Sequence, residues 1–340
     1  MVLGDRDPAI DRRGKAFMWQ SLVAASAAMI VVGLLAFAAA GCGSDGSEDS
    51  SRDSSSEDSS RDSGGLIAFV ADKGSGYQIY TVRPNGHGLR QITHVDGEAL
   101  NPDWSPDGSQ IAFALNECSV AIMNADGTDR RVLPSETPGG CEADPSFTPD
   151  GSRLVYERYD PPDDDAVWSM NLDGTDRQRV TAPNMGAPDP NVSPDGGTVS
   201  FVCGKKEGEL QALCAVEIDG SNVRKLTTYG LEAGIKHDWA PNGKHIVLTP
   251  HADYPNHKSP NVATMRPDGS HLRMLTRYTG GKQGAFAGSY SADGRWIVFR
   301  VENLERERFR LFKMRPDGTH RTLIKRLPFG PGFIDWGPRP

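Results

Sequence analysis

The sequence predicts an all-β fold, a six-bladed β-propeller whose blades are four-stranded antiparallel sheets. Two alternating turn signals, with short apolar segments between them, carry this prediction. The first signal is Ser-Pro-Asp-Gly or a close variant, and its glycines recur every 43 to 51 residues at Gly108, Gly151, Gly196, Gly243 and Gly294. The second is an Asp-Gly or Asn-Gly turn that ends at Gly86, Gly127, Gly174, Gly220, Gly269 and Gly318. A period of this size is typical of a repeat architecture with one supersecondary unit per repeat.

The segments between the turns predict strands rather than helices. In the first turn, proline presets φ for the first central position, Asp or Asn tolerates the second, and glycine takes the positive φ. Alternating, β-branched and aromatic residues follow this turn at 111–113, 154–156, 199–201, 246–248 and 297–299. Similar residues precede the second turn at 79–82, 120–123, 167–170, 262–265 and 311–314. Shorter apolar segments follow the second turn, so each repeat predicts four antiparallel strands, and radial stacking of such sheets makes a propeller.

The two ends of the repeat region set the number of blades. There are six turns of the second kind but only five of the first, and the opening repeat begins at its second strand, residues 67–70. Residues 334–338 resemble the segment that precedes each first turn, such as residues 102–105 and 237–240. We therefore expect the C-terminal strand to complete the first blade and close a ring of six blades, which removes open sheet edges.

The repeat itself resembles that of a known family. The pattern Pro-x-Trp-Ser-Pro-Asp-Gly, then Ile-Ala-Phe, Ile-Tyr-x-Met-x-x-Asp-Gly and Leu-Thr is similar to the TolB-type, WD40-like propeller repeat, and it covers roughly residues 66–340. The TolB family proper carries a separate N-terminal domain and works with a peptidoglycan-associated partner. That domain is not recognised here, so the resemblance implies the fold more strongly than the partner, because propellers host many activities.

The N-terminal region predicts export and lipidation. Arg12, Arg13 and Lys15 precede an apolar run over residues 21–41, which ends in Ala-Ala-Ala-Gly before Cys42. This pattern is typical of a signal peptide, and the cysteine after it resembles the bacterial lipobox, in which that residue is lipidated. An uncleaved membrane anchor is the alternative, since the run is nearly long enough to span a bilayer. Both readings place the propeller on the extracytoplasmic face of the cell membrane.

The domain boundaries follow from composition. We expect a lipoprotein signal peptide at 1–41, a disordered tether at 42–64 and the propeller at 65–340, because the tract after Cys42 is rich in Ser, Asp and Glu and has no apolar residue. The whole chain has a net charge of −8. No basic stripe indicates nucleic-acid binding, and the expected state is a monomer.

Four cysteines remain besides Cys42, an even number in a compartment that permits disulfides. Cys203 and Cys214 fall in neighbouring strands of the fourth blade and are predicted to pair. Cys118 and Cys141 fall in loops that open on the same face of the propeller, so they are predicted to meet as well. Free buried thiols are the alternative, and no spacing suggests zinc.

Three carboxylates stand out on the inner strands. Asp103, Asp238 and Asp335 each precede the recurrent tryptophan, and inner strands line the channel of a propeller. An oxygen-rich convergence suits a channel ligand or a cation such as Ca²⁺. The alternative is that each carboxylate caps a neighbouring backbone group. No other metal or cofactor is indicated.

The sequence offers no catalytic motif. It has neither a Gly-x-Ser-x-Gly elbow nor a phosphate-binding glycine loop. His237, His251 and His257 are assigned to loops of the fifth blade on one face, where they would be solvated or, less simply, bind a metal.

The predicted function is therefore that of a protein- or ligand-binding scaffold in the cell envelope, not an enzyme. Recognition is expected on a face of long loops, where the candidate residues are Tyr159, Tyr254, Arg306, Arg308, Phe329 and Phe333. The partner would be an envelope protein or a glycan, and its identity cannot be read from the chain. The alternative is a lyase or hydrolase that acts on extracellular polysaccharide.

Overall fold

The computed structural model describes residues 64–339 apart from 75, 137–138, 161–163, 184, 186–187, 205–210, 232, 234–235, 251–258, 304–305 and 307. The predicted signal peptide, Cys42, nearly all of the tether, Tyr254, His251 and His257 lie outside the described residues. Predictions about them stay predictions.

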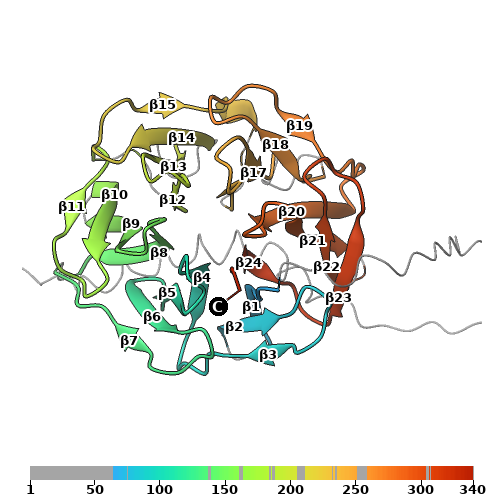
Figure 1. The fold of residues 1–340 in the computed structure, drawn as a ribbon, viewed down its shortest axis with the longest axis horizontal. Helices are drawn as coiled ribbons and strands as arrows, with labels where there is room; N and C mark the ends of the chain where they lie inside the picture. The colour runs from blue at the N-terminus through green and yellow to red at the C-terminus, as the bar shows by residue number, and fades with distance from the viewer. Residues whose placement is uncertain are drawn as a thin grey trace, which may run out of the picture. The chain divides into compact units, whose positions relative to one another are not determined.

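Six four-stranded antiparallel sheets surround a common centre, which confirms the predicted fold class (Figure 1). From inner to outer strand, blade 1 contains β24 (Gly332–Trp336), β1 (Ile67–Asp72), β2 (Tyr77–Val82) and β3 (Arg90–Gln91). Blade 2 contains β4 (Ala99–Trp104), β5 (Gln110–Leu115), β6 (Ser119–Asn124) and β7 (Arg131–Val132). Blade 3 contains β8 (Cys141–Phe147), β9 (Arg153–Asp160), β10 (Asp164–Asn171) and β11 (Gln178–Arg179).

The remaining three blades follow the same order. Blade 4 contains β12 (Asn191–Val192), β13 (Thr198–Cys203), β14 (Ala212–Glu217) and β15 (Arg224–Lys225). A 3-10 turn, η2 (Tyr229–Leu231), leads to blade 5 with β16 (Asp238–Trp239), β17 (Ile246–Leu248), β18 (Ala263–Met265) and β19 (Arg273–Met274). Blade 6 contains β20 (Gln283–Tyr290), β21 (Ile297–Asn303), β22 (Arg308–Met314) and β23 (Thr322–Leu327).

The ring closes as the sequence predicts. Strand β24, from the C-terminal end, pairs antiparallel with β1, and Ile67 lies opposite Trp336 while Ala68 lies opposite Asp335. The N–H of Gly337 also donates to the carbonyl of Leu66 at 2.9 Å. The two ends of the propeller therefore form one blade, and the inner edge of β1 is covered rather than left open.

Both turn signals form the turns expected of them. In the first, Gly108 has φ 72° and its N–H donates to the Ser105 carbonyl at 2.8 Å. In the second, Gly127 has φ 90°, and a Cβ added there would collide with the carbonyl of Ile92 in the preceding blade. Glycine is required at this turn for its φ and because the outer strand of the neighbouring blade packs directly against it.

The core lies between blades as well as within them. The recurrent aromatic position of the inner strands is buried at Trp104, Phe147, Trp239, Tyr290 and Trp336. Tyr80 and Phe329, from blade 1 and the segment before β24, pack in the same cluster as Trp336. Within the described part of the chain, no helix has the length and apolar character needed to cross a bilayer.

Candidate functional site: the inner-strand channel and the loop face

Each inner strand is tied to the next by a side-chain oxygen that accepts a backbone N–H. Asp335 accepts from Trp104 at 3.0 Å, and Asp103 accepts from Phe147 at 2.8 Å. Four further links complete the ring, at 2.6 to 3.1 Å between donor and acceptor. The acceptor side chains are Asp144, Asp189, Asp238 and Ser289, and the backbone N–H donors are, in the same order, Asp189, His237, Tyr290 and Trp336. All six blades are linked in one direction around the channel.

Two backbone positions supply these acceptors. Asp103, Asp238, Asp335 and Ser289 come directly before the recurrent aromatic residue. Asp144 comes three residues before Phe147, and Asp189 comes three residues before Val192, which takes the same position in blade 4. The chain is left-handed at both aspartates, with φ 49° and 53°. Register shifts interrupt the pairing of β4, β8, β20 and β24 with their neighbouring strands. A bulge of this kind re-aims side chains.

The structure thus places the three predicted channel aspartates together, and each caps the neighbouring inner strand. Sequence analysis missed the other two carboxylates, Asp144 and Asp189, as well as Lys236. All three stand three residues before the recurrent aromatic position, so counting back along the repeat could have found them.

Asp103, Asp144, Asp189 and Lys236 line a small polar cavity in the channel. Its lining contains three inner-strand segments, 101–103, 144–146 and 189–191, with Lys236 and Phe333. The cavity has a volume of about 10 Å³, enough for about one water molecule. The Oδ1 of Asn101 is buried on this wall without a hydrogen-bond partner.

The negative charges of the channel raise one another's proton affinity. Burial raises the pKa of Asp144 to about 7, and the neighbouring Asp189 adds to the rise. Burial and then repulsion from Asp335 raise the pKa of Asp238 to about 7, while Lys236 opposes them. The same two causes hold the pKa of Asp103 well above its usual value. The channel therefore holds five aspartates, and Lys236 is the cation that acts on them.

A serine, a histidine and an aspartate form a line between blades 4 and 5. The Ser200 Oγ lies 2.8 Å from Nε2 of His237, and Nδ1 of His237 lies 3.0 Å from Oδ2 of Asp189. These are the residue types of the triad of serine hydrolases, in which the aspartate accepts a hydrogen bond from Nδ1 of the histidine. Here the His237 Nδ1 is buried near Asp189 but makes no hydrogen bond. The sequence pattern does not predict this arrangement, because Ser200 lies within β13 while Asp189 and His237 lie just before β12 and β16.

The surroundings of Ser200 are those of a structural group. Ser200 and His237 are both 0% exposed, whereas a nucleophile must reach its substrate. The indole N–H of Trp239 already donates to Ser200 Oγ at 2.8 Å. The placement of His237 in a solvent-facing loop was therefore wrong, because its ring is fully buried and contacts Ser200 and Asp189 of the neighbouring blade 4.

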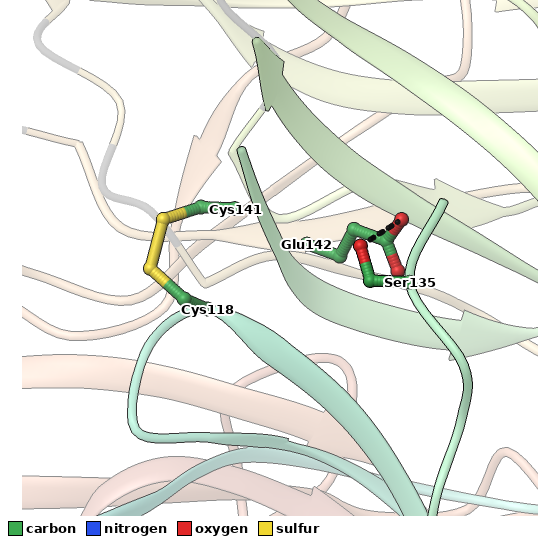
Figure 2. Close-up of a disulfide and its surroundings, with 4 residues drawn as sticks. All are labelled: Cys118, Ser135, Cys141 and Glu142. Atoms are coloured by element: carbon green, nitrogen blue, oxygen red, sulfur yellow. Dashed lines mark hydrogen bonds between the residues drawn. A yellow bond between two sulfur atoms is a disulfide. The ribbon is translucent and has the colours of Figure 1, made fainter. Parts of the chain in front are cut away.

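Two disulfides join the cysteine pairs that the sequence favoured. Cys203 and Cys214 bridge β13 and β14 within blade 4, with Cα atoms 5.8 Å apart. Cys118 and Cys141 connect blade 2 to blade 3, with Cα atoms 4.1 Å apart (Figure 2). Beside the second bridge, the Ser135 hydroxyl donates to the buried Glu142 carboxylate at 3.3 Å, and Arg177 pairs with Glu142 at 2.7 Å. The disulfide and the Ser135 hydrogen bond thus both connect blade 3 to the chain of blade 2, while the Arg177–Glu142 ion pair lies within blade 3.

Two residues predicted for the loop face are buried. Phe329 and Phe333, predicted as surface anchors, are only 8% and 7% exposed. Phe329 packs on Tyr80 with ring centroids 5.4 Å apart, and Phe333 belongs to β24 at a left-handed position. Both placements were wrong, because the Gly/Pro-rich segment 328–333 turns inward to start the closing strand.

The other loop-face candidates differ in exposure. Arg306 and Arg308 are exposed at the turn between β21 and β22. Tyr159 is half-buried near the end of β9, opposite Cys141 and Asp165. The two arginines are therefore the accessible members of the predicted face among the described residues, and no group of three or more His, Cys, Asp or Glu residues there is placed to hold a metal.

Comparison with known proteins gives a consistent result. The family described as TolB beta propeller domain matches residues 49–185 and 135–339. The Tol-Pal system protein TolB of Nitratidesulfovibrio vulgaris is 37% identical over 91 residues, which is 26% of this chain and 21% of that protein. A TolB homolog of Chlorobium luteolum is 29% identical over 142 residues, 41% of this chain and 31% of that protein. The matched regions span less than a third of these relatives.

Solved structures show the same fold. The crystal structure of TolB from Acinetobacter baumannii superposes with a TM-score of 0.65 at 21% identity, covering 82% of this chain and 68% of that one. The structure of a TolB-like protein from Agrobacterium tumefaciens gives a TM-score of 0.62 at 16% identity, covering 81% of this chain and 99% of that one.

Proposed function

Because this chain belongs to the TolB beta propeller domain family, we propose that it is a protein-binding scaffold of the cell envelope. In this proposal a signal peptide at 1–41 directs export, lipidated Cys42 anchors the protein, and residues 42–64 tether the propeller outside the cytoplasm. The apolar run that ends in Ala-Gly-Cys supports the anchor.

The main support for the proposal is a difference in exposure between the channel network and the loop face. The Ser200, His237 and Asp189 groups that could perform acid–base chemistry are buried and hold two blades together. Arg306 and Arg308 are exposed at a turn on a rigid sheet. Exposed arginines on a preformed scaffold can anchor a partner through carboxylates. One relative is a Tol-Pal system protein, which supports an envelope protein as the partner class.

The test is capture of an envelope partner by the full-length protein in detergent extract. Arg306→Ala/Arg308→Ala is expected to reduce recovery of the partner several-fold with an unchanged melting temperature. Arg130→Ala is the matched control, because this arginine is exposed beside the turn that enters β7, on the opposite side of the propeller. Equal recovery with all three proteins would argue against the loop face.

The polysaccharide-enzyme hypothesis is tested with the same preparations. Purified protein is expected to leave a panel of extracellular polysaccharides intact. Turnover that disappears in His237→Ala or Asp238→Asn, at temperatures where both variants stay folded, would replace the scaffold proposal with the enzyme.

A further inference from the structure

We propose that the Lys236 ammonium is the resident cation of the propeller channel, and that it neutralises the inner-strand carboxylates in place of a bound metal ion. The cation is thus part of the chain, contributed by the segment that leads into β16. Ring closure would then be independent of divalent metal.

The placement of Lys236 is the first argument. It lines the axial cavity together with Asp103, Asp144 and Asp189, which come from three other blades. The buried Oδ1 of Asn101, which lacks a hydrogen-bond partner, lies on the same wall. An ammonium offers three donors to such a set of oxygens, and the space beside it admits about one water molecule to bridge them.

The charge balance is the second argument. Asp335, Asp103, Asp144, Asp189 and Asp238 come from five blades, and all interact electrostatically with Lys236. Burial would lower the pKa of Lys236, but the attraction of Asp189, Asp335, Asp103 and Asp238 outweighs burial and raises it. Lys236 is therefore charged at any physiological pH.

The direction of the carboxylates is the third argument. The five aspartates each use an Oδ2 to accept a backbone N–H from the next blade. Each of these carboxylates is therefore held against the neighbouring blade, and the five bonded oxygens do not meet at one point in the channel. Metal ions need several oxygens at short and nearly equal distances, whereas a single ammonium can balance charges that are spread around it. The geometry favours the lysine over the Ca²⁺ that the sequence allowed.

The experiment measures the melting temperature of the full-length protein with EDTA or with millimolar CaCl₂, at pH 8 and pH 5. Wild type is expected to melt at the same temperature with either addition. Lys236→Met, which keeps the length of the stem, is expected to melt on the order of 10 °C lower at pH 8. At pH 5 most of this deficit should disappear, because Asp103, Asp144 and Asp238 take up protons. Asp189, Asp335 and His237 are the other titratable groups around Lys236.

Lys236→Arg keeps the charge and should melt near wild type at both pH values. If Lys236→Met does not fold at pH 8, it is prepared at pH 5, where it is expected to fold. A Ca²⁺-dependent rise in the wild-type melting temperature would overturn the proposal. So would an equal deficit of Lys236→Met at both pH values, or its failure to fold at either, since lost packing alone would not depend on pH.

Discussion

Asp335 accepts a hydrogen bond from the backbone N–H of Trp104 at 3.0 Å, although the two residues are 231 positions apart in the chain. Asp335 lies in β24, the strand that closes blade 1, and Trp104 ends the inner strand of blade 2. The contact therefore begins the ring of six inter-blade links and depends on the C-terminal strand being in place.

Removing that strand should open the ring. Truncation after Phe333 deletes most of β24, exposes the edge of β1 and removes the acceptor for Trp104. The free energy of unfolding is expected to fall by several kcal/mol, a large part of the stability of a domain. Truncation after Pro338 is the control, because it spares β24. Denaturant midpoints that coincide for the two truncations would contradict the closure described above.

Removing the inter-blade disulfide should cost more than removing the one within a blade. The Cys118–Cys141 bridge closes a loop of 23 residues, and the Cys203–Cys214 bridge closes one of 11. In the chain-entropy description each is worth about 3 kcal/mol, with the longer loop worth somewhat more. Urea denaturation of the two double-alanine variants checks the order. Reaction of all four thiols with an alkylating agent in unreduced protein would show that neither bridge forms.

Neutralising one channel carboxylate should stabilise the protein at high pH. The pKa of Asp238 in the folded protein is raised to about 7, so its charged form disfavours folding. The free energy of unfolding therefore decreases as the pH rises from about 4 through 7. Asp238→Asn retains an oxygen for the Tyr290 N–H. It should unfold at higher temperature than wild type at pH 8, with the difference vanishing below pH 4.

Asp107→Asn is the control with the opposite sign. Hydrogen bonds from Ser105 and Ser109 lower the pKa of Asp107 to about 2, so its charged form favours folding above pH 4. The control should be slightly less stable than wild type at neutral pH. Identical pH profiles for the two variants would show that channel repulsion does not limit stability.

The serine between blades 4 and 5 should matter for stability. Ser200→Ala removes the acceptor of the Trp239 indole N–H and the partner of His237. Leaving these buried groups unpaired is expected to cost about 1–3 kcal/mol in thermal unfolding. A variant as stable as wild type would show that the network has no structural role.

The repeat also predicts a stabilising change. Ala68 in β1 corresponds to Ser200 in β13, and the indole N–H of Trp104 in the next blade is buried without a partner. Ala68→Ser is expected to supply the missing acceptor and raise stability by about 1 kcal/mol. Calorimetry checks this change, and a lower melting temperature would mean that the site has no room for the hydroxyl.

The blades could be predicted because their signals are local. A turn such as Ser105 to Gly108 is specified by four adjacent residues, and the five copies reinforce one another. The channel could be predicted only in part. Asp144 reaches it from a left-handed position at the bulge of β8, and Asp189 from a left-handed position just before β12, which the alternation of a regular strand does not anticipate.

The misplaced residues have a common cause. Phe329, Phe333 and His237 are all predicted to lie in exposed loops, but all three are buried. Their burial depends on partners far along the chain, such as Tyr80 for Phe329 and Ser200 for His237. Such contacts exist only after neighbouring blades have packed together.

The most direct test of the scaffold proposal is photo-crosslinking in cells that produce the full-length protein. A photoreactive residue is placed at position 308 on the loop face, or at position 130 on the opposite side as the control. Crosslinking from position 308 alone to one envelope protein, in a membrane fraction that depends on Cys42, is the result we predict. Equal crosslinking from both positions, or none from position 308 when the protein is folded and exported, would contradict the proposal.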